Sequence, residues 1–134
     1  MVDFKEFPLR GEGPVYVRIV RYIRAGVAAG TIRDGEEMPS RRVLSALLGV
    51  NPNTVQKAYR MLEEEGLMVS RSGAKSCARA TPELVEQAKK ALQAQEVAGA
   101  VAALFRGGMG KDEALELISR MWDELSESEG GEET

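Results

Sequence analysis

The sequence predicts a mainly α-helical fold in which three short helices and a β-hairpin are followed by two longer helices. Three observations support this prediction. Apolar residues recur at helical spacing through most of the 134 residues. Glycine and proline interrupt these runs and mark the turns between them. The segments 67–70 and 75–79 are instead predicted to be two short strands joined by a turn at residues 71–74.

The first helix is predicted to run from Pro14 to Ala29. Pro14 suits the first turn of a helix because its missing N–H would be unpaired there, and Gly30 suits the end. The predicted inward face repeats every four residues: Val15, Ile19, Ile23 and Val27.

The second helix is predicted to have only about two turns. Ser40 is a suitable N-cap and Gly49 ends the helix. We expect one face to pack inward, formed by Val43, Leu44, Leu47 and Leu48.

The third helix is predicted to begin with Asn51 as its cap and Pro52 in its first turn, and to end at Gly66. Its core face is Val55, Ala58, Tyr59 and Leu62. Two helices joined through a glycine turn and followed by a two-stranded ribbon are typical of a winged helix-turn-helix. We therefore assign residues 10–79 to such a domain.

Two further helices are expected after the hairpin. Thr81-Pro82 repeats the pattern of cap and proline, residues 107–110 interrupt the helix, and a last helix covers residues 112–125. We assign residues 80–126 to a helical dimerisation segment and residues 127–134 to an acidic, disordered tail.

Charge is distributed unevenly along the chain. Residues 10–79 carry 12 Lys and Arg against 7 Asp and Glu, a net charge of +5, whereas residues 80–134 carry 5 against 12, a net charge of −7. The first part therefore suits a polyanionic partner, although solvated charged faces would give the same counts.

Composition argues against catalysis. The chain has no histidine and a single cysteine, Cys77, which excludes imidazole-ligated zinc, histidine-dependent hydrolysis and an internal disulfide. The sequence has no recognisable nucleophile–base pair, phosphate loop or metal-ligand cluster, so we expect no enzymatic activity, no metal and no cofactor. Cys77 lacks a resolving cysteine and is expected to be inert rather than a redox sensor. Without an 18-residue apolar run or a secretory leader, we expect a cytoplasmic protein with no membrane contact.

The elements PSRRVL at residues 39–44 and LGVNPNTV at residues 48–55, with the Glu-Gly-Leu exit from the third helix, resemble the DNA-binding domain of the GntR family of bacterial transcription regulators. The short helical remainder resembles the YtrA-like branch, whose two C-terminal helices dimerise and which often controls transporter operons. The resemblance implies a homodimeric regulator, a repressor rather than an activator, that binds a palindromic double-stranded DNA operator. A small-molecule effector is compatible with this resemblance, but the sequence identifies none.

The predicted DNA-binding residues fall on three segments. A recognition helix presents its first residues to base edges, where Asn and Gln can pair with adenine and Lys with guanine. Arg42 matches the family's arginine at the start of the second helix, and the wing is expected to approach the backbone or minor groove. Asn51 is interpreted as a helix cap, and Arg41 and Arg60 as solvated charges. The predicted set is Ser40, Arg42, Asn53, Thr54, Gln56, Lys57, Arg71, Gly73 and Lys75.

The predicted dimer interface collects the apolar positions of the last two helices. It comprises Leu84, Ala88, Ala91, Ala98, Ala102, Phe105, Leu115, Ile118, Met121, Trp122 and Leu125. Met121 and Trp122 would alternatively line an effector pocket. A winged-helix module that binds proteins and not DNA is the rival interpretation of the whole chain, and the +5 charge of residues 10–79 argues against it.

Overall fold

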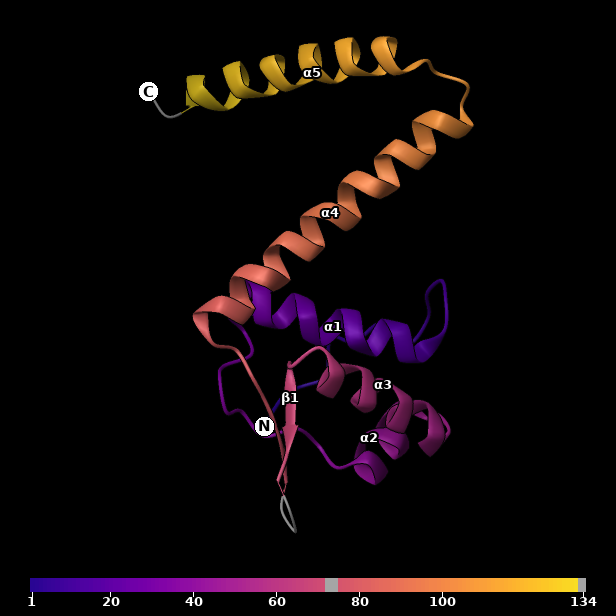
Figure 1. Ribbon diagram of the computed structural model, residues 1–134, viewed down its shortest axis with the longest axis vertical. Coiled ribbons are helices and arrows are strands. Elements are labelled where there is room, and N and C mark those ends of the chain that lie inside the picture. The colour runs from indigo at the N-terminus through magenta and orange to yellow at the C-terminus, as the bar shows by residue number, and fades with distance from the viewer. Residues whose placement is uncertain (72–74, 133–134) are drawn as a thin grey trace. The chain divides into compact units, whose positions relative to one another are not determined.

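A computed structural model describes residues 1–71 and 75–132, and it confirms the mainly α-helical class (Figure 1). The chain divides into two compact units, Met1–Gln93 and Ala94–Thr134. In chain order the elements are α1 (Val15–Ala29), α2 (Arg41–Leu48), α3 (Pro52–Glu64), β1 (Met68–Ser70), β2 (Ser76–Ala78), α4 (Pro82–Arg106) and α5 (Lys111–Glu132).

The predicted helix starts are confirmed by their hydrogen bonds. The Ser40 hydroxyl accepts the Val43 N–H at 3.1 Å, and the Asn51 side-chain oxygen accepts the Asn53 N–H at 2.8 Å. Both caps satisfy backbone donors that a helix leaves unpaired in its first turn. At the other end of α2, Gly49 adopts a φ of 68°, a conformation that glycine reaches without strain. Local chemistry therefore sets the tight corner between α2 and α3.

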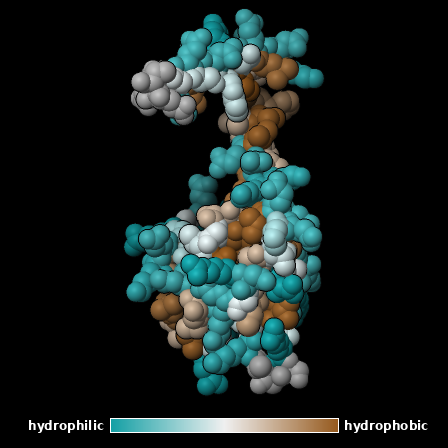
Figure 2. All heavy atoms as spheres, turned by 90° about the vertical axis from the view of Figure 1, so that its left-hand side faces the viewer, coloured by the Kyte–Doolittle hydropathy of each residue, from teal (hydrophilic) through white to brown (hydrophobic). Residues whose placement is uncertain are grey.

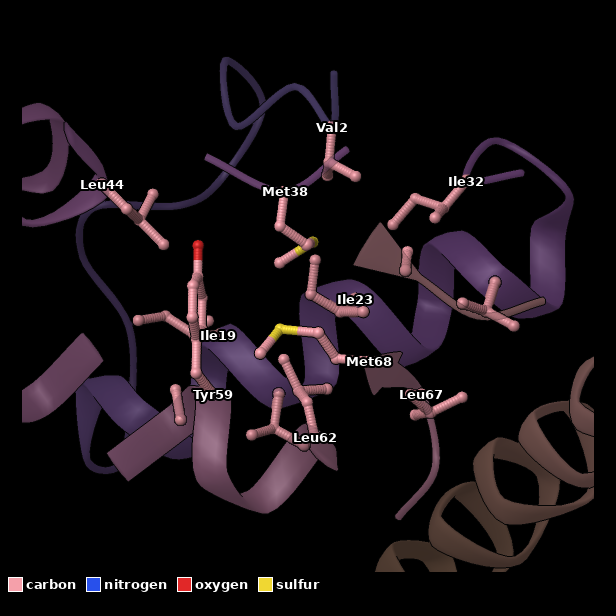
Figure 3. Close-up of a cluster of buried hydrophobic side chains, with 14 of the residues drawn as sticks. Val2, Ile19, Ile23, Ile32, Met38, Leu44, Tyr59, Leu62, Leu67 and Met68 are labelled. Carbon is pink, nitrogen blue, oxygen red and sulfur yellow. The ribbon is translucent and has the colours of Figure 1, made fainter. Parts of the chain in front are cut away.

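The core of the first unit lies between α1 and α3. Their buried faces match the predicted spacing, since Ile19, Ile23 and Val27 on α1 have no exposed surface. Helix α1 packs against α3, whose Tyr59 and Leu62 are also fully buried (Figure 3). Tyr59 is fully buried, and its hydroxyl donates to the Pro39 carbonyl oxygen at 2.6 Å. Burial raises the pKa of the Tyr59 phenol, which the nearby Arg41 guanidinium partly opposes. The phenol therefore remains a donor at neutral pH.

The expected inward face of α2 was partly wrong. Leu44 is buried, but Val43 and Leu47 are 51% and 62% exposed. A two-turn helix touches its neighbour along a narrow strip, and the buried position beside Leu44 belongs to Ser45. The Ser45 hydroxyl donates to the Val50 carbonyl oxygen at 2.6 Å, so this polar residue closes the turn between the helices.

The first seven residues, which the sequence analysis left outside the domain, pack against it. Val2, Phe4 and Phe7 are at most 5% exposed. Phe4 stacks on Tyr22 of α1 with ring centroids 5.1 Å apart, and the Val2 N–H donates to the Glu37 carbonyl oxygen at 2.8 Å. These residues therefore extend the core on the far side of α1.

The wing is a two-stranded antiparallel ribbon with Met68 opposite Ala78 and Ser70 opposite Ser76. Gly73, predicted to contact DNA, lies outside the described residues. Cys77 is a half-buried free thiol on β2, and its expected inertness stays a prediction.

Helix α4 begins within the first unit. Ala88 is 4% exposed, and Leu84 and Val85 pack against the same core. Leu84 and Ala88 belong to the predicted dimer interface, and within one chain they already contact this core, so their part in pairing stays a prediction. None of the helices that the structure describes combines the length and apolar character needed to cross a membrane.

The second unit contains the rest of α4 and all of α5. Helix α5 continues to Glu132, seven residues beyond the expected end at Leu125. The segment predicted to be a tail is thus helical up to that residue, although Gly130 and Gly131 are weak helix formers.

Candidate nucleic-acid interface

The start of α3 combines a buried face with a polar exposed face. Val55, Ala58 and Tyr59 are fully buried and hold the helix against the core, whereas Asn53 and Lys57 are exposed. Thr54 and Gln56 are half-buried between these faces. The structure therefore brings the four predicted recognition residues of α3 together within the first two turns. Amide, hydroxyl and ammonium groups in this arrangement suit the edges of bases in a major groove.

Lys57 is supported by a residue of α1. Its ammonium nitrogen lies 4.0 Å from the centre of the Tyr16 ring, in the geometry of a cation–π contact. This contact restricts a side chain that would otherwise sample many rotamers. This contact cannot be predicted from the sequence, because the two residues are far apart in the chain.

Helix α2 places two predicted residues beside α3. Ser40 is exposed at the N-cap, and Arg42 is exposed in the first turn. Arg42 forms no ion pair with any residue in the ranges 1–71 and 75–132. Its guanidinium is therefore available to a base or a phosphate, and α2 lies against α3 along the corner that Gly49 forms (Figure 1).

One hydrogen bond joins the base of the wing to α3, and another crosses the ribbon. The Ser70 hydroxyl donates to the Glu63 carboxylate at 2.6 Å and lies 3.1 Å from the Ser76 hydroxyl across the ribbon. Arg71 and Lys75, the predicted wing contacts in the described residues, are both exposed beyond this anchor. These bonds fix where the wing leaves the helical body.

The arrangement provides groups that suit the recognition of a polyanion. Arg42, Lys57, Arg71 and Lys75 are exposed cations of the first unit, and the amides Asn53 and Gln56 lie on the same helix as Lys57. No group of His, Cys, Asp and Glu in the described part of the chain could hold a metal ion. The site can attract a polyanion and discriminate among hydrogen-bonding edges.

Comparison with known proteins agrees with this geometry. The profile described as bacterial regulatory proteins, gntR family, matches residues 15–75. The uncharacterised regulator YhcF of Bacillus subtilis is 30% identical over 105 residues, which span 78% of this chain and 87% of YhcF. The transcriptional repressor YtrA of the same organism is 36% identical over 64 residues, 48% of this chain. That match covers only 49% of YtrA.

A solved structure shares the architecture over a larger part of the chain. A GntR family transcriptional regulator from Listeria monocytogenes matches with a TM-score of 0.66 and 26% identity. The match covers 83% of this chain and 97% of the Listeria protein. The similarity therefore includes residues beyond the winged domain.

Proposed function

This chain belongs to the GntR family of bacterial regulatory proteins, and from that premise we propose that it is a transcriptional repressor that binds a palindromic operator as a homodimer. The family consists of DNA-binding regulators of transcription and not of enzymes. We further propose that it acts in the cytoplasm on a nearby operon, and that this is a transporter operon, as the resemblance to the YtrA-like branch implies. The proposal of repression is supported by the likeness to YtrA, which is itself a repressor.

The observation that carries the DNA-binding proposal is the exposed polar surface at the start of α3. Four residues with base-reading or phosphate-binding side chains lie on a helix whose other face is anchored by Val55, Ala58 and Tyr59. A helix held this firmly can present its side chains without reordering on binding, which limits the entropic cost of recognition.

The proposed dimer rests on apolar surface in the second unit. In the single chain Phe105 is 82% exposed, Trp122 is 70% exposed and Ile118 is 44% exposed. The α5 residues among the exposed apolar positions recur at helical spacing: Leu115, Ile118, Met121, Trp122 and Leu125. Figure 2 shows such apolar surface on the helices of this unit. A second copy of the chain supplies the simplest cover for a continuous apolar stripe.

The test of DNA binding is its dependence on salt. If Arg42, Lys57, Arg71 and Lys75 of two subunits neutralise about six to eight phosphates, log K should fall against log salt with a slope of roughly −5 to −7. Selection from random DNA yields the operator, and fluorescence anisotropy of that duplex across a salt series measures the slope. A slope near zero, or no binding, would support the rival interpretation of a protein-binding module.

A further inference from the structure

We propose that Arg41 and Lys75 together bind one phosphate of the DNA backbone, in a pocket between the start of α2 and the base of the wing. This inference rests on the proposed function and adds to it a contact that the sequence analysis had dismissed, since Arg41 was interpreted as a solvated charge. The ligand is a backbone phosphodiester, so the contact contributes affinity and register rather than base discrimination.

The pocket has a volume of about 390 Å³, and both cations line it. Ser40, Ser76, Tyr59 and the acidic Glu37 belong to the same lining. The two cations and the two serines suit a singly charged phosphodiester that takes the place of the Glu37 carboxylate beside Lys75. Ser40 and Lys75 already belong to the predicted DNA-binding set, so the pocket is part of the same surface.

Arg41 is held in place but has donors to spare. Its guanidinium carbon lies 5.4 Å from the centre of the Tyr59 ring, which is itself anchored to the Pro39 carbonyl oxygen at 2.6 Å. The Arg41 Nε is buried and has no hydrogen-bond partner among the described residues. The buried Nε cannot itself reach an ion in the pocket, so the donors for a phosphate are those of the Nη groups, which the Tyr59 ring holds in place.

The carboxylate nearest to Arg41 does not use up these donors. Arg41 Nη2 lies 3.6 Å from Glu63 Oε1, which is longer than a hydrogen bond. The same Glu63 oxygen accepts the Ser70 hydroxyl at 2.6 Å. Glu63, which is hydrogen-bonded to Ser70 at the base of the wing, therefore lies near the Arg41 guanidinium without using up the N–H groups of Arg41. These groups remain available to a closer acceptor.

Lys75 reaches the pocket from the wing. Its Nζ lies 3.3 Å from a Glu37 carboxylate oxygen, and its side chain is 75% exposed. An exposed ion pair of this kind is weak and exchanges its partner readily. A phosphate in the pocket can thus replace Glu37 as the partner of Lys75 while Arg41 stays on Tyr59.

The test uses the full-length chain, its selected operator and three variants. Arg41→Gln removes the charge, Arg41→Lys retains it, and Arg24→Gln is the charge-matched control. Arg24 pairs with Glu65 at 2.6 Å and lines a different cavity, beside α4. Arg41→Gln should weaken operator binding and make the salt slope shallower by at most about 1 for each subunit, because Lys75 still faces the same phosphate, while Arg41→Lys and Arg24→Gln should stay close to the unchanged protein.

A second measurement locates the phosphate. In a series of operators with one methylphosphonate each, the unchanged protein should lose affinity at the phosphate in the pocket. Arg41→Gln and the surface variant Lys75→Gln should both become insensitive to that same position, and Arg24→Gln should not. Lys75→Gln keeps the test valid if Arg41→Gln fails to fold.

Three outcomes separate this inference from the proposed function. If the unchanged protein binds its operator but Arg41→Gln keeps both the full slope and the full methylphosphonate profile, Arg41 only packs on Tyr59 and the inference is wrong. If the Lys75 and Arg41 variants become insensitive to different phosphates, the shared pocket is wrong. If the unchanged protein binds no DNA, the proposed function itself fails.

Discussion

Tyr59 links the core to the proposed interface. Its ring packs in the core, its hydroxyl holds the Pro39 carbonyl oxygen just before α2, and its outer face supports Arg41. We expect Tyr59→Phe to lower the free energy of unfolding by about 1–3 kcal/mol, because the buried carbonyl of Pro39 loses its donor. Urea unfolding followed by circular dichroism measures this loss, and an unchanged midpoint would contradict it.

The burial of Tyr59 also leads us to predict that the stability of the protein depends on pH. Burial raises the pKa of Tyr59 in the folded protein, whereas in the unfolded chain the phenol has its ordinary pKa of about 10. The unfolded state therefore loses this proton first as the pH rises, and the contribution of Tyr59 is present below pH ~10 and falls above it. Stability measured between pH 9 and pH 11 should decline more steeply in the unchanged protein than in Tyr59→Phe. Parallel curves would show that Tyr59 does not cause the decline.

Base recognition and phosphate contact can be separated residue by residue. We expect Gln56→Ala and Arg42→Ala each to lose about 1–3 kcal/mol of binding free energy on the operator and little on random DNA, because each side chain would reach a base edge. Anisotropy titrations on both duplexes at one salt concentration provide the comparison. Equal losses on the two duplexes would reassign that side chain to the backbone.

At the scale of elements, local chemistry made the helix boundaries of the winged domain predictable. Ser40, Asn51 and Gly49 act within one turn of their own positions, so their capping hydrogen bonds and positive φ follow from the nearby sequence. The clustering of Asn53 and Lys57 on one exposed face follows from helical spacing for the same reason.

Contacts between distant segments were not predictable in this way. Phe4 stacks on Tyr22, and Lys57 lies over Tyr16, because the tertiary fold brings these pairs together. Helix spacing alone also could not show which of the apolar α2 residues would be covered. Val43 and Leu44 are adjacent apolar residues, and only the tertiary packing of this short helix decides that Leu44 is buried and Val43 is exposed.

The apolar stripe of α5 allows a matched test of pairing. We expect Trp122→Glu to convert the dimer to a monomer, because it places a charge in the proposed apolar interface. Ser119→Glu adds the same charge to an exposed polar position of the same helix and should remain dimeric. Sedimentation velocity distinguishes the two states. A dimeric Trp122→Glu variant would move the interface away from this stripe.

At the scale of the whole molecule, the two parts of the chain carry opposite charge. Residues 10–79 have a net charge of +5 and residues 80–134 a net charge of −7. The acidic helices are repelled by DNA, while the basic domain is attracted to it. The proposed pairing surface and the proposed DNA-binding surface therefore lie in different parts of the sequence, which makes a truncation informative.

The end of the first unit determines where the chain should be cut. A fragment ending at residue 79 would lose Leu84, Val85 and Ala88, which pack against the core, whereas a fragment of residues 1–93 keeps them. Burying a side chain such as leucine fully contributes about 1.5–3 kcal/mol, so the shorter fragment should melt at a lower temperature. Thermal unfolding of the two fragments checks this expectation, and equal melting temperatures would mean that the start of α4 adds nothing to the fold.

The 1–93 fragment then isolates the contribution of dimerisation. We expect it to be monomeric and to bind a single half-site, because it retains α2, α3 and the wing but lacks the apolar stripe of α5. Linking two such domains raises the effective affinity for a palindrome by about 10²- to 10⁴-fold, and the fragment should lose that factor when tested on the full operator. Gel-shift titrations on a half-site and on the palindrome, with sedimentation of the free fragment, measure both effects. The expectation is contradicted if the fragment still forms dimers, or if it binds the palindrome as tightly as the intact chain. Either result would place the subunit contacts within residues 1–93 and leave the exposed residues of α5 without a role in pairing.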